Sequence, residues 1–167
     1  MLCSMTTRRS QVSRRPVHFD SLEQEVFLNL WRTYDRLRAL EDDLFLKFDL
    51  TPQQYNALRL LRAAEPDAVP TLTLANRLVS RAPDITRLLD KLAERQAIVR
   101  ERPADNRRVV AVRITPAGIA LLDSIAEPLR ECHTKQLGHL SASQLRQLGE
   151  LLKDARRPHE IDDGPWS

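Results

Sequence analysis

The stretch Ile85-Thr86-Arg87-Leu88-Leu89-Asp90-Lys91-Leu92 decides how the rest of the chain is interpreted. Its apolar residues recur three, four and seven positions after the first, which is typical of a helix with one buried face. The remaining positions are polar or charged: Thr86, Arg87, Asp90 and Lys91. We therefore expect a helix over about 82–95 with one face in a core and a polar face exposed.

The pattern changes directly after this helix. Residues 98–102 and 109–114 are short runs rich in β-branched residues, and the polar turn Pro103-Ala104-Asp105-Asn106-Arg107-Arg108 separates them. This arrangement predicts a hairpin with a charged tip over about 98–114, the only β-structure that we expect.

The segment before the helix supplies its support. Thr51 and Pro52 have the residue types of a helix cap and a first helical position, and residues 64–70 have the composition of a loop. Thr71 or Thr73 is then expected to cap a short helix that carries Leu74, Ala75 and Leu78. Helix, short helix, amphipathic helix and hairpin in this order predict a winged helix-turn-helix domain over 50–115.

Long helices are expected on both sides of this domain. Ser21 and Gln24 form a capping-box pattern, and apolar residues from Phe27 to Phe48 recur at close to 3.5-residue spacing. Because this stripe has two apolar faces, we expect residues 20–49 to pack on their own domain and on a partner subunit. Thr115-Pro116 and the Ser141–Gln144 box predict two further helices within 116–157, with Pro128 inside the first.

The fold class is therefore mainly α with a small β-hairpin wing, a winged helix-turn-helix domain plus a helical dimerisation region. Residues 1–19 are expected to be a disordered basic arm, and residues 158–167 a frayed tail. The arm is interpreted as a tail, with a DNA contact as the alternative.

Composition excludes several classes of function. No apolar run approaches the roughly 20 residues of a membrane span, and no apolar stretch follows the basic start. We therefore expect a cytoplasmic protein with no membrane partner. The four histidines have no ligand-like spacing, and the sequence has no Gly-flanked serine and no paired carboxylates in a turn context. We therefore expect no metal, no cofactor and no enzymatic activity. Cys3 and Cys132 are interpreted as free thiols, with Cys132 packed on an apolar helix face.

Charge is concentrated where a nucleic acid would bind. Residues 71–113 hold ten basic and five acidic residues. A basic segment of this kind favours a polyanionic partner. A helix with a polar outer face fits the major groove of DNA, and a neighbouring hairpin tip with arginines fits the minor groove.

Four motifs in this order resemble the multiple-antibiotic-resistance regulator (MarR) family of bacterial transcription factors. They are Leu74-Ala75-x-x-Leu78, the stretch 85–92, Asp105-Asn106-Arg107-Arg108, and Ile114-Thr115-Pro116-Ala117-Gly118. With the flanking helices the resemblance covers about 20–155. It implies a recognition helix at 82–95, a wing at 98–114, and a homodimer built from the first helix and the last two.

The resemblance also implies a sequence-specific transcriptional regulator, a dimeric repressor that binds double-stranded DNA at a pseudo-palindromic operator. A small, often aromatic, anionic ligand would release it, and tentative pocket residues are Trp31, Tyr34 and Tyr55, which are equally compatible with a core. The expected DNA-binding residues are Arg77, Arg81, Asp84, Thr86, Arg87, Lys91, Asn106, Arg107 and Arg108. Asp105 is expected to orient one wing arginine.

Several alternatives stay open from the sequence. Arg107 fits the minor-groove position by motif spacing, and Arg108 then contacts phosphate; the alternative is that Arg108 occupies the minor-groove position. Asp84 either accepts a hydrogen bond from a cytosine amino group or only favours the helix dipole. A cysteine redox sensor, as in some family members, is the alternative for Cys132. A winged-helix module for protein interaction or DNA architecture, without ligand response, is the alternative function.

Overall fold

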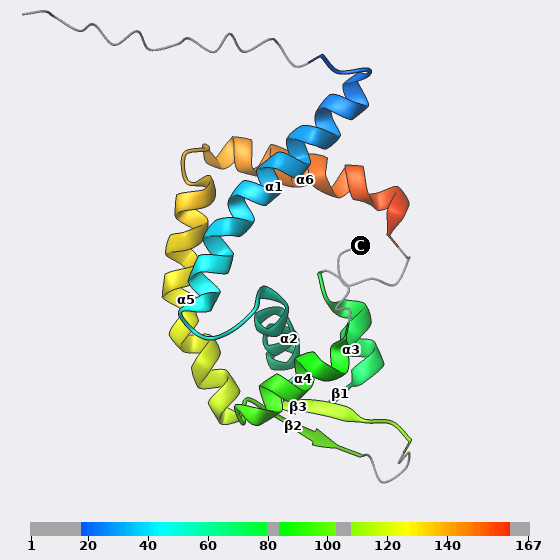
Figure 1. Cartoon of the computed structure of the whole chain (residues 1–167), viewed down its shortest axis with the longest axis vertical. Coiled ribbons are helices and arrows are strands. Elements are labelled where there is room, and N and C mark those ends of the chain that lie inside the picture. Colours follow the sequence, from blue (N-terminus) through cyan, green and yellow to red (C-terminus); the bar gives the residue numbers. More distant parts are fainter. Residues whose placement is uncertain (1–17, 80–83, 103–107, 161–167) are drawn as a thin grey trace, which may run out of the picture. The chain divides into compact units, whose positions relative to one another are not determined.

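A computed structural model describes residues 18–79, 84–102 and 108–160. In chain order its elements are α1 (Leu22–Leu46), α2 (Pro52–Ala63), β1 (Val69–Pro70), α3 (Thr71–Arg77), α4 (Ile85–Glu94), β2 (Ile98–Glu101), β3 (Ala111–Ile114), α5 (Pro116–Leu137), α6 (Ala142–Arg156) and a 3₁₀ turn at Arg157–His159 (Figure 1). The predicted fold class, mainly α with a small β-wing, is confirmed. Within the described ranges, no helix has the length and apolar character that crossing a membrane requires.

The chain divides into two compact units, Met1–Asp35 and Arg36–Ser167, so that α1 begins in one and ends in the other. In the first unit, the Ser21 hydroxyl accepts a hydrogen bond from the Gln24 amide, as the capping-box pattern predicts. The Gln24 side chain accepts from the Asp20 amide, one residue earlier than the pattern requires. Apolar side chains of this part of α1 are exposed: Leu22, Val26, Phe27, Leu28, Leu30, Trp31 and Tyr34.

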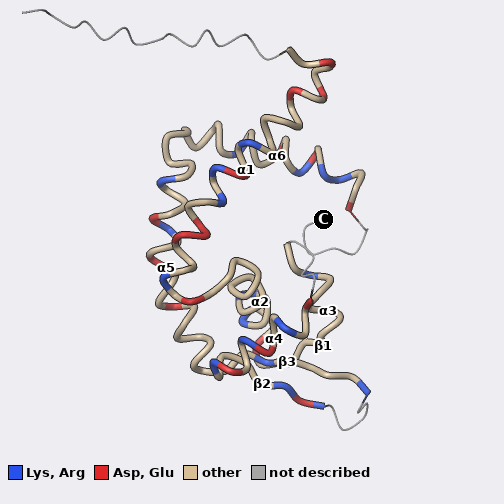
Figure 2. Tube along the Cα trace, viewed as in Figure 1, with Lys and Arg blue, Asp and Glu red and all other residues tan. Residues whose placement is uncertain are grey.

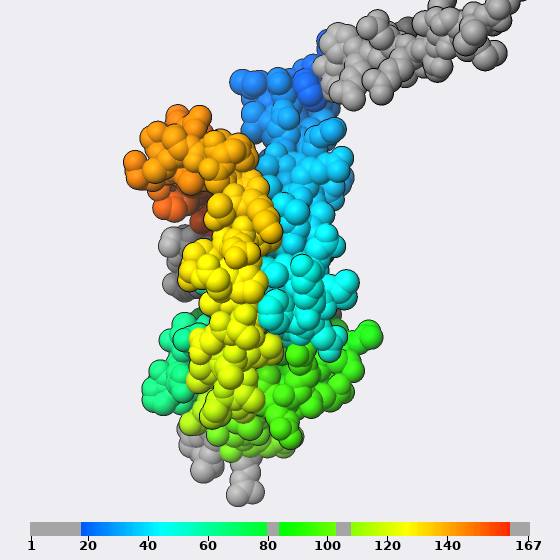
Figure 3. All heavy atoms as spheres, turned by 90° about the vertical axis from the view of Figure 1, so that its left-hand side faces the viewer, coloured from blue at the N-terminus to red at the C-terminus, as the bar shows by residue number. Residues whose placement is uncertain are grey.

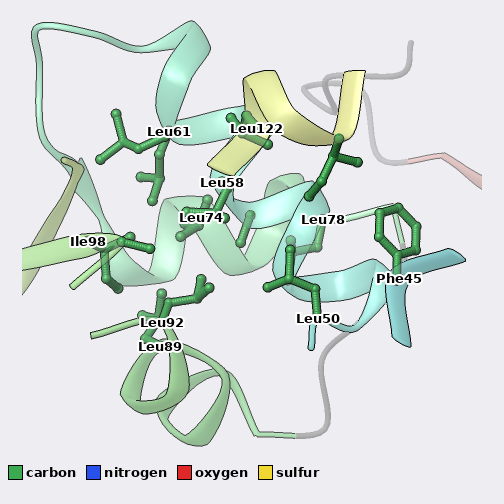
Figure 4. Close-up of a cluster of buried hydrophobic side chains, with 14 of the residues drawn as sticks. Phe45, Leu50, Leu58, Leu61, Leu74, Leu78, Leu89, Leu92, Ile98 and Leu122 are labelled. Atoms are coloured by element: carbon green, nitrogen blue, oxygen red, sulfur yellow. The ribbon is translucent and has the colours of Figure 1, made fainter. Parts of the chain in front are cut away.

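One hydrophobic core holds the second unit together (Figure 4). Every helix from α1 to α5 and all three strands contribute to it. The largest fully buried side chains are Phe45, Leu58, Leu61, Leu74, Leu89, Leu92, Val112 and Ile125. Each buried side chain of this size contributes about 1.5–3 kcal/mol relative to exposure. The core therefore fixes α4 through its two central leucines, Leu89 and Leu92.

The sheet has three strands in the order β1-β3-β2, all antiparallel. Strands β2 and β3 form the predicted hairpin, with Ile98 opposite Ile114 and Glu101 opposite Ala111. The prediction that this hairpin is the only β-structure is wrong, because Val69–Pro70 pairs with β3 inside the segment interpreted as a loop. Val69 is buried, and Pro70, which has no N–H to donate, is tolerated on an edge strand.

The start of α3 also differs from the prediction. Pro70 occupies the cap position and makes no side-chain capping bond, so neither Thr71 nor Thr73 caps this helix. Instead the Thr71 hydroxyl and amide both donate to the Val110 carbonyl oxygen, at 2.9 and 3.0 Å. The hydroxyl thus links α3 to the segment that leads into β3.

The predicted starts of α2, α5 and α6 are confirmed. Thr51 and Gln54 form a complete capping box with Pro52 in the first turn, and Ser141 and Gln144 form another. Thr115 caps α5 and accepts from the Gly118 amide. The C-terminal part of α1, from Arg36 on, lies along α5 (Figure 3), and the Gln136 side chain donates to the Leu37 carbonyl oxygen at 2.8 Å.

Candidate nucleic-acid interface

Helix α4 is the centre of the candidate interface. It spans Ile85–Glu94, within the predicted 82–95, and Asp84 is its N-cap. The Asp84 carboxylate accepts a hydrogen bond from the Arg87 amide at 2.9 Å. This bond satisfies one of the amides that every helix start leaves without a partner. Asp84 thus has a structural role that accounts for its position, and its predicted DNA contact stays a prediction.

The outward face of α4 is polar, as the sequence predicts. Thr86, Arg87, Asp90 and Lys91 are exposed, and Leu89 and Leu92 on the opposite side are buried. The Lys91 ammonium lies 2.8 Å from the Glu94 carboxylate on the exposed surface. Figure 2 shows that basic and acidic residues both lie along α4 and β2.

The remaining predicted DNA contacts are only partly described. Arg77 is exposed in the last turn of α3, and Arg108 is exposed just before β3. Arg81, Asp105, Asn106 and Arg107 lie outside the described residues. The choice between Arg107 and Arg108 for the minor groove therefore remains a prediction.

Sequence reasoning missed a charge pair that joins the wing to α4. The Arg100 guanidinium of β2 lies 2.7 Å from the Asp90 carboxylate and donates to the Thr86 carbonyl oxygen at 3.2 Å. Neither periodicity nor capping signals such a pair, because its partners belong to different elements. The only available sign was an acid on the exposed face of a helix followed by an arginine in the next strand.

A second pair crosses the hairpin itself. The Arg113 guanidinium of β3 lies 2.8 Å from the Glu101 carboxylate of β2. Among the described residues, the buried Nε atom of Arg113 has no hydrogen-bond partner. The base of the wing is therefore connected by charge pairs both to α4 and across its own strands.

A groove of about 790 Å³ lies between α4 and the start of α2. Its apolar lining includes Leu46, Leu50 and Leu88, and its charged lining comprises Asp49, Asp84, Arg87, Lys91, Glu94 and Arg95. Arg95 crosses from the end of α4 and donates to the carbonyl oxygens of Phe48, at 3.0 Å, and Asp49. This arginine, also missed from the sequence, ties α4 to the loop after α1.

The aromatic residues predicted to line a pocket belong to different units. Tyr55 packs on Phe45 with ring centroids 4.9 Å apart, is half-buried, and does not line the groove at α4. Burial raises the pKa of its phenol. In the first unit, Tyr34 is exposed, and Trp31 borders a separate hollow with Phe19 and Leu28. The ligand pocket predicted from these three side chains therefore stays a prediction.

Cys132 is buried on α5, as predicted, and 7% of its surface is exposed. Burial, and then the Glu41 charge, raise the pKa of its thiol. Thiolates are the reactive form of cysteine, so this environment favours packing over redox chemistry. Among the residues that the structure describes, no three His, Cys, Asp or Glu side chains gather in a way that could hold a metal ion.

Comparison with known proteins agrees with this geometry. The MarR family profile matches residues 50–110. A MarR transcription factor from Planctomyces limnophilus is 51% identical, with a TM-score of 0.65 over 81% of this chain and 98% of that one. A mutant of MarR from E. coli, solved in complex with operator DNA, is 22% identical, with a TM-score of 0.70 over 81% and 98%.

A further structure concerns the regulation of DNA binding of BpsR from Bordetella bronchiseptica by 6-hydroxynicotinic acid. It is 22% identical, with a TM-score of 0.66 over 78% of this chain and 98% of that one. At 22% identity, the E. coli MarR and BpsR structures support the fold alone. The P. limnophilus protein, at 51% identity, is a close relative over nearly its whole length. The wing, the anchored α4 and this relationship together show that the chain is a transcriptional regulator of the MarR family.

Proposed function

We propose that this protein is a dimeric repressor that binds a pseudo-palindromic operator and leaves it when a small aromatic anion binds. The observation that carries the proposal is the construction of α4. Leu89 and Leu92 anchor the helix in the core, and Thr86, Arg87 and Lys91 face solvent. A helix anchored in this way can enter the major groove and present side chains to base edges and phosphates.

Each predicted contact has a separate role in this proposal. Arg87 and Lys91 contact DNA from the centre of α4, and Thr86 contacts a base or a phosphate. Arg77 and Arg81 hold the backbone, while Asn106 and one arginine of the wing, Arg107 or Arg108, meet the flanking minor groove, with Asp105 orienting that arginine. The E. coli MarR structure with operator DNA supports a DNA-binding role for this fold.

Dimerisation is supported by apolar side chains that the chain itself leaves exposed. On α1 these include Phe27, Trp31 and Tyr34, and on α6 they are Leu145, Leu148 and Leu151. No residue of α6 is buried within the chain. A helix with exposed leucines along one face is typical of a subunit interface, because water would otherwise cover that apolar surface.

Ligand release is supported by the groove at α4. Its volume lies within the roughly 300–1,000 Å³ of small-molecule sites. Its lining combines leucines with the cations Arg87, Lys91 and Arg95, next to three carboxylates. An anion bound there would compete with DNA for Arg87 and Lys91. The ligand named for BpsR, 6-hydroxynicotinic acid, has the chemistry expected of such an effector. Trp31, Tyr34 and Tyr55 remain candidates for a separate aromatic contact.

The test is fluorescence anisotropy with duplexes tiled from the region upstream of the chain's own gene, compared with scrambled duplexes over a salt series. We expect one tile to bind about 10³-fold or more tightly than scrambled DNA, with a steep loss of affinity as salt rises. Arg87→Ala combined with Arg107→Ala should abolish this preference. Equal weak binding to every tile would favour the architectural alternative, and no binding at low salt would refute DNA recognition.

A further inference from the structure

We propose that Arg100 is a positioning residue for DNA recognition, which pairs with Asp90 to hold the base of the wing at a fixed angle to α4. This inference rests on the proposed DNA-binding function and extends it to a pair that does not itself contact bases. In this arrangement the helix in the major groove and the wing in the minor groove reach DNA as one rigid element.

The Arg100 guanidinium contacts α4 at two residues, Asp90 and Thr86. Its Nη2 atom lies 2.7 Å from the Asp90 Oδ1 atom and 3.2 Å from the Thr86 carbonyl oxygen. Thr86 and Asp90 are one helical turn apart, so they lie on the same side of α4. Two acceptors on one turn define both the position and the direction of the Arg100 side chain.

The connection continues across the hairpin. Arg100 lies opposite Val112, which is fully buried, and the next residue, Glu101, pairs with Arg113 at 2.8 Å. One charge pair therefore joins α4 to β2, and a second joins β2 to β3, in addition to the packing between these elements. A change in the angle between hairpin and helix must break the Arg100–Asp90 pair.

The alternative role for Arg100 is a direct phosphate contact, and the two roles predict opposite effects at Asp90. Asp90 is exposed on the polar face of α4, where its charge would repel DNA phosphates. If only electrostatics matter, removing this carboxylate strengthens binding and frees Arg100 for phosphate. If the pair sets geometry, removing it weakens binding to the specific site only.

The matched control is Glu94, another exposed acid of α4. Its carboxylate pairs with Lys91 at 2.8 Å, within the same helix, and has no partner on the wing among the described contacts. Asp90→Ala and Glu94→Ala remove the same charge and place the same good helix former on the same helix. They differ in whether the connection to the wing is lost.

The experiment measures the affinity of the full-length protein for two short duplexes at fixed salt. The specific probe is the duplex that the wild-type protein selects from a random pool, and the non-specific probe is its scrambled version. We expect Asp90→Ala to weaken specific binding about tenfold while non-specific binding becomes tighter. Glu94→Ala should tighten both. Tighter specific binding by Asp90→Ala, or no change, would overturn the positioning role.

A double variant supplies a second measurement. Arg100→Met should also weaken specific binding. The double variant, Asp90→Ala with Arg100→Met, should bind the specific duplex no more weakly than the single variant with the lower affinity, because both substitutions break the same pair. Additive losses would show that Arg100 acts on DNA directly, and would overturn the inference. Retained binding to the scrambled duplex shows that each variant is folded. A wild-type protein that selects no duplex would instead refute the proposed function, and this inference with it.

Discussion

Asp84 illustrates how a single residue can satisfy two chemical demands in one place. A carboxylate before a recognition helix is suited to a cytosine amino group, and it is equally suited to the free amides of the first turn. In the structure it accepts from the Arg87 amide at 2.9 Å. In the protein without DNA, the Asp84 Oδ1 atom therefore already accepts a backbone hydrogen bond.

Replacing Asp84 separates the two roles. Asp84→Ala removes the cap and should lower the free energy of unfolding by about 1 kcal/mol, whereas Asp84→Ser keeps a capping oxygen and should change it little. If Asp84 only caps α4, the serine variant retains the sequence preference of the wild type. Urea denaturation and binding to single-base variants of the selected duplex measure the two effects. Relaxed preference at one base pair in the serine variant would establish a base contact.

Gln96 occupies a backbone conformation that favours glycine. Its φ is 56°, and its carbonyl oxygen accepts the Thr115 hydroxyl at 2.6 Å, so the turn between α4 and β2 is held in this form. A side chain in the left-handed region costs about 1–2 kcal/mol. Gln96→Gly should therefore raise the melting temperature by about 2–4 °C.

The control for Gln96 is the same replacement in a regular helix. Gln147 is exposed in the middle of α6, where glycine costs about 1 kcal/mol relative to good helix formers. Gln147→Gly should therefore lower the melting temperature. Thermal unfolding of both variants, followed by circular dichroism, compares the two signs. A destabilised Gln96→Gly protein would contradict the strain assigned to this turn.

At the scale of elements, the first turn of α5 packs closely against the turn between α4 and β2. The Thr115 amide donates to the Ala97 carbonyl oxygen at 3.1 Å, and Thr115 also caps the helix. A Cβ atom at Gly118 would overlap the Ala97 carbonyl oxygen and approach Ile114 Cγ1 to 2.8 Å. Only glycine lets the helix and the wing base lie this close.

Two glycine replacements should therefore act in opposite directions. Gly118→Ala should destabilise the protein by about 1–3 kcal/mol, because backbone has to move. Gly149→Ala, on α6, meets no atom within 4 Å and should stabilise it by about 1 kcal/mol through helix propensity. Denaturant unfolding of the two variants gives the comparison. Equal effects of both replacements would refute the close approach at Gly118.

The elements that sequence predicts well are those specified by local chemistry. The capping boxes at Thr51 and Ser141 and the apolar period of α4 involve residues a few positions apart, and the structure contains them. Strand β1 has only two residues, too few to show a period, and depends on pairing with β3. Arg95 reaches Phe48, 47 residues earlier, so its role depends on the folded chain. The same holds for Arg100 in the candidate interface.

At the scale of the whole molecule, the distribution of apolar surface favours a second copy of the chain. The buried core of the second unit contains no residue of α6, and Leu151 on this helix is 59% exposed. Pseudo-palindromic operators require two recognition helices related by a two-fold axis. Operator affinity should therefore depend on side chains that lie on α6 and not on the DNA-binding elements.

Charges on α6 test this dependence. Leu148→Glu with Leu151→Glu should convert a dimer into a monomer in sedimentation velocity, because two carboxylates would have to be buried in the interface. Helix content by circular dichroism should stay close to that of the wild type, since both side chains are exposed within the chain. Operator affinity should fall at least about a hundredfold, because the half-sites are then bound independently.

Leu72→Glu, on α3 and 74% exposed, is the control that should leave the sedimentation coefficient unchanged. A double variant that still sediments as the wild type does would remove α6 from the interface, and a wild-type monomer at all concentrations would refute the dimer.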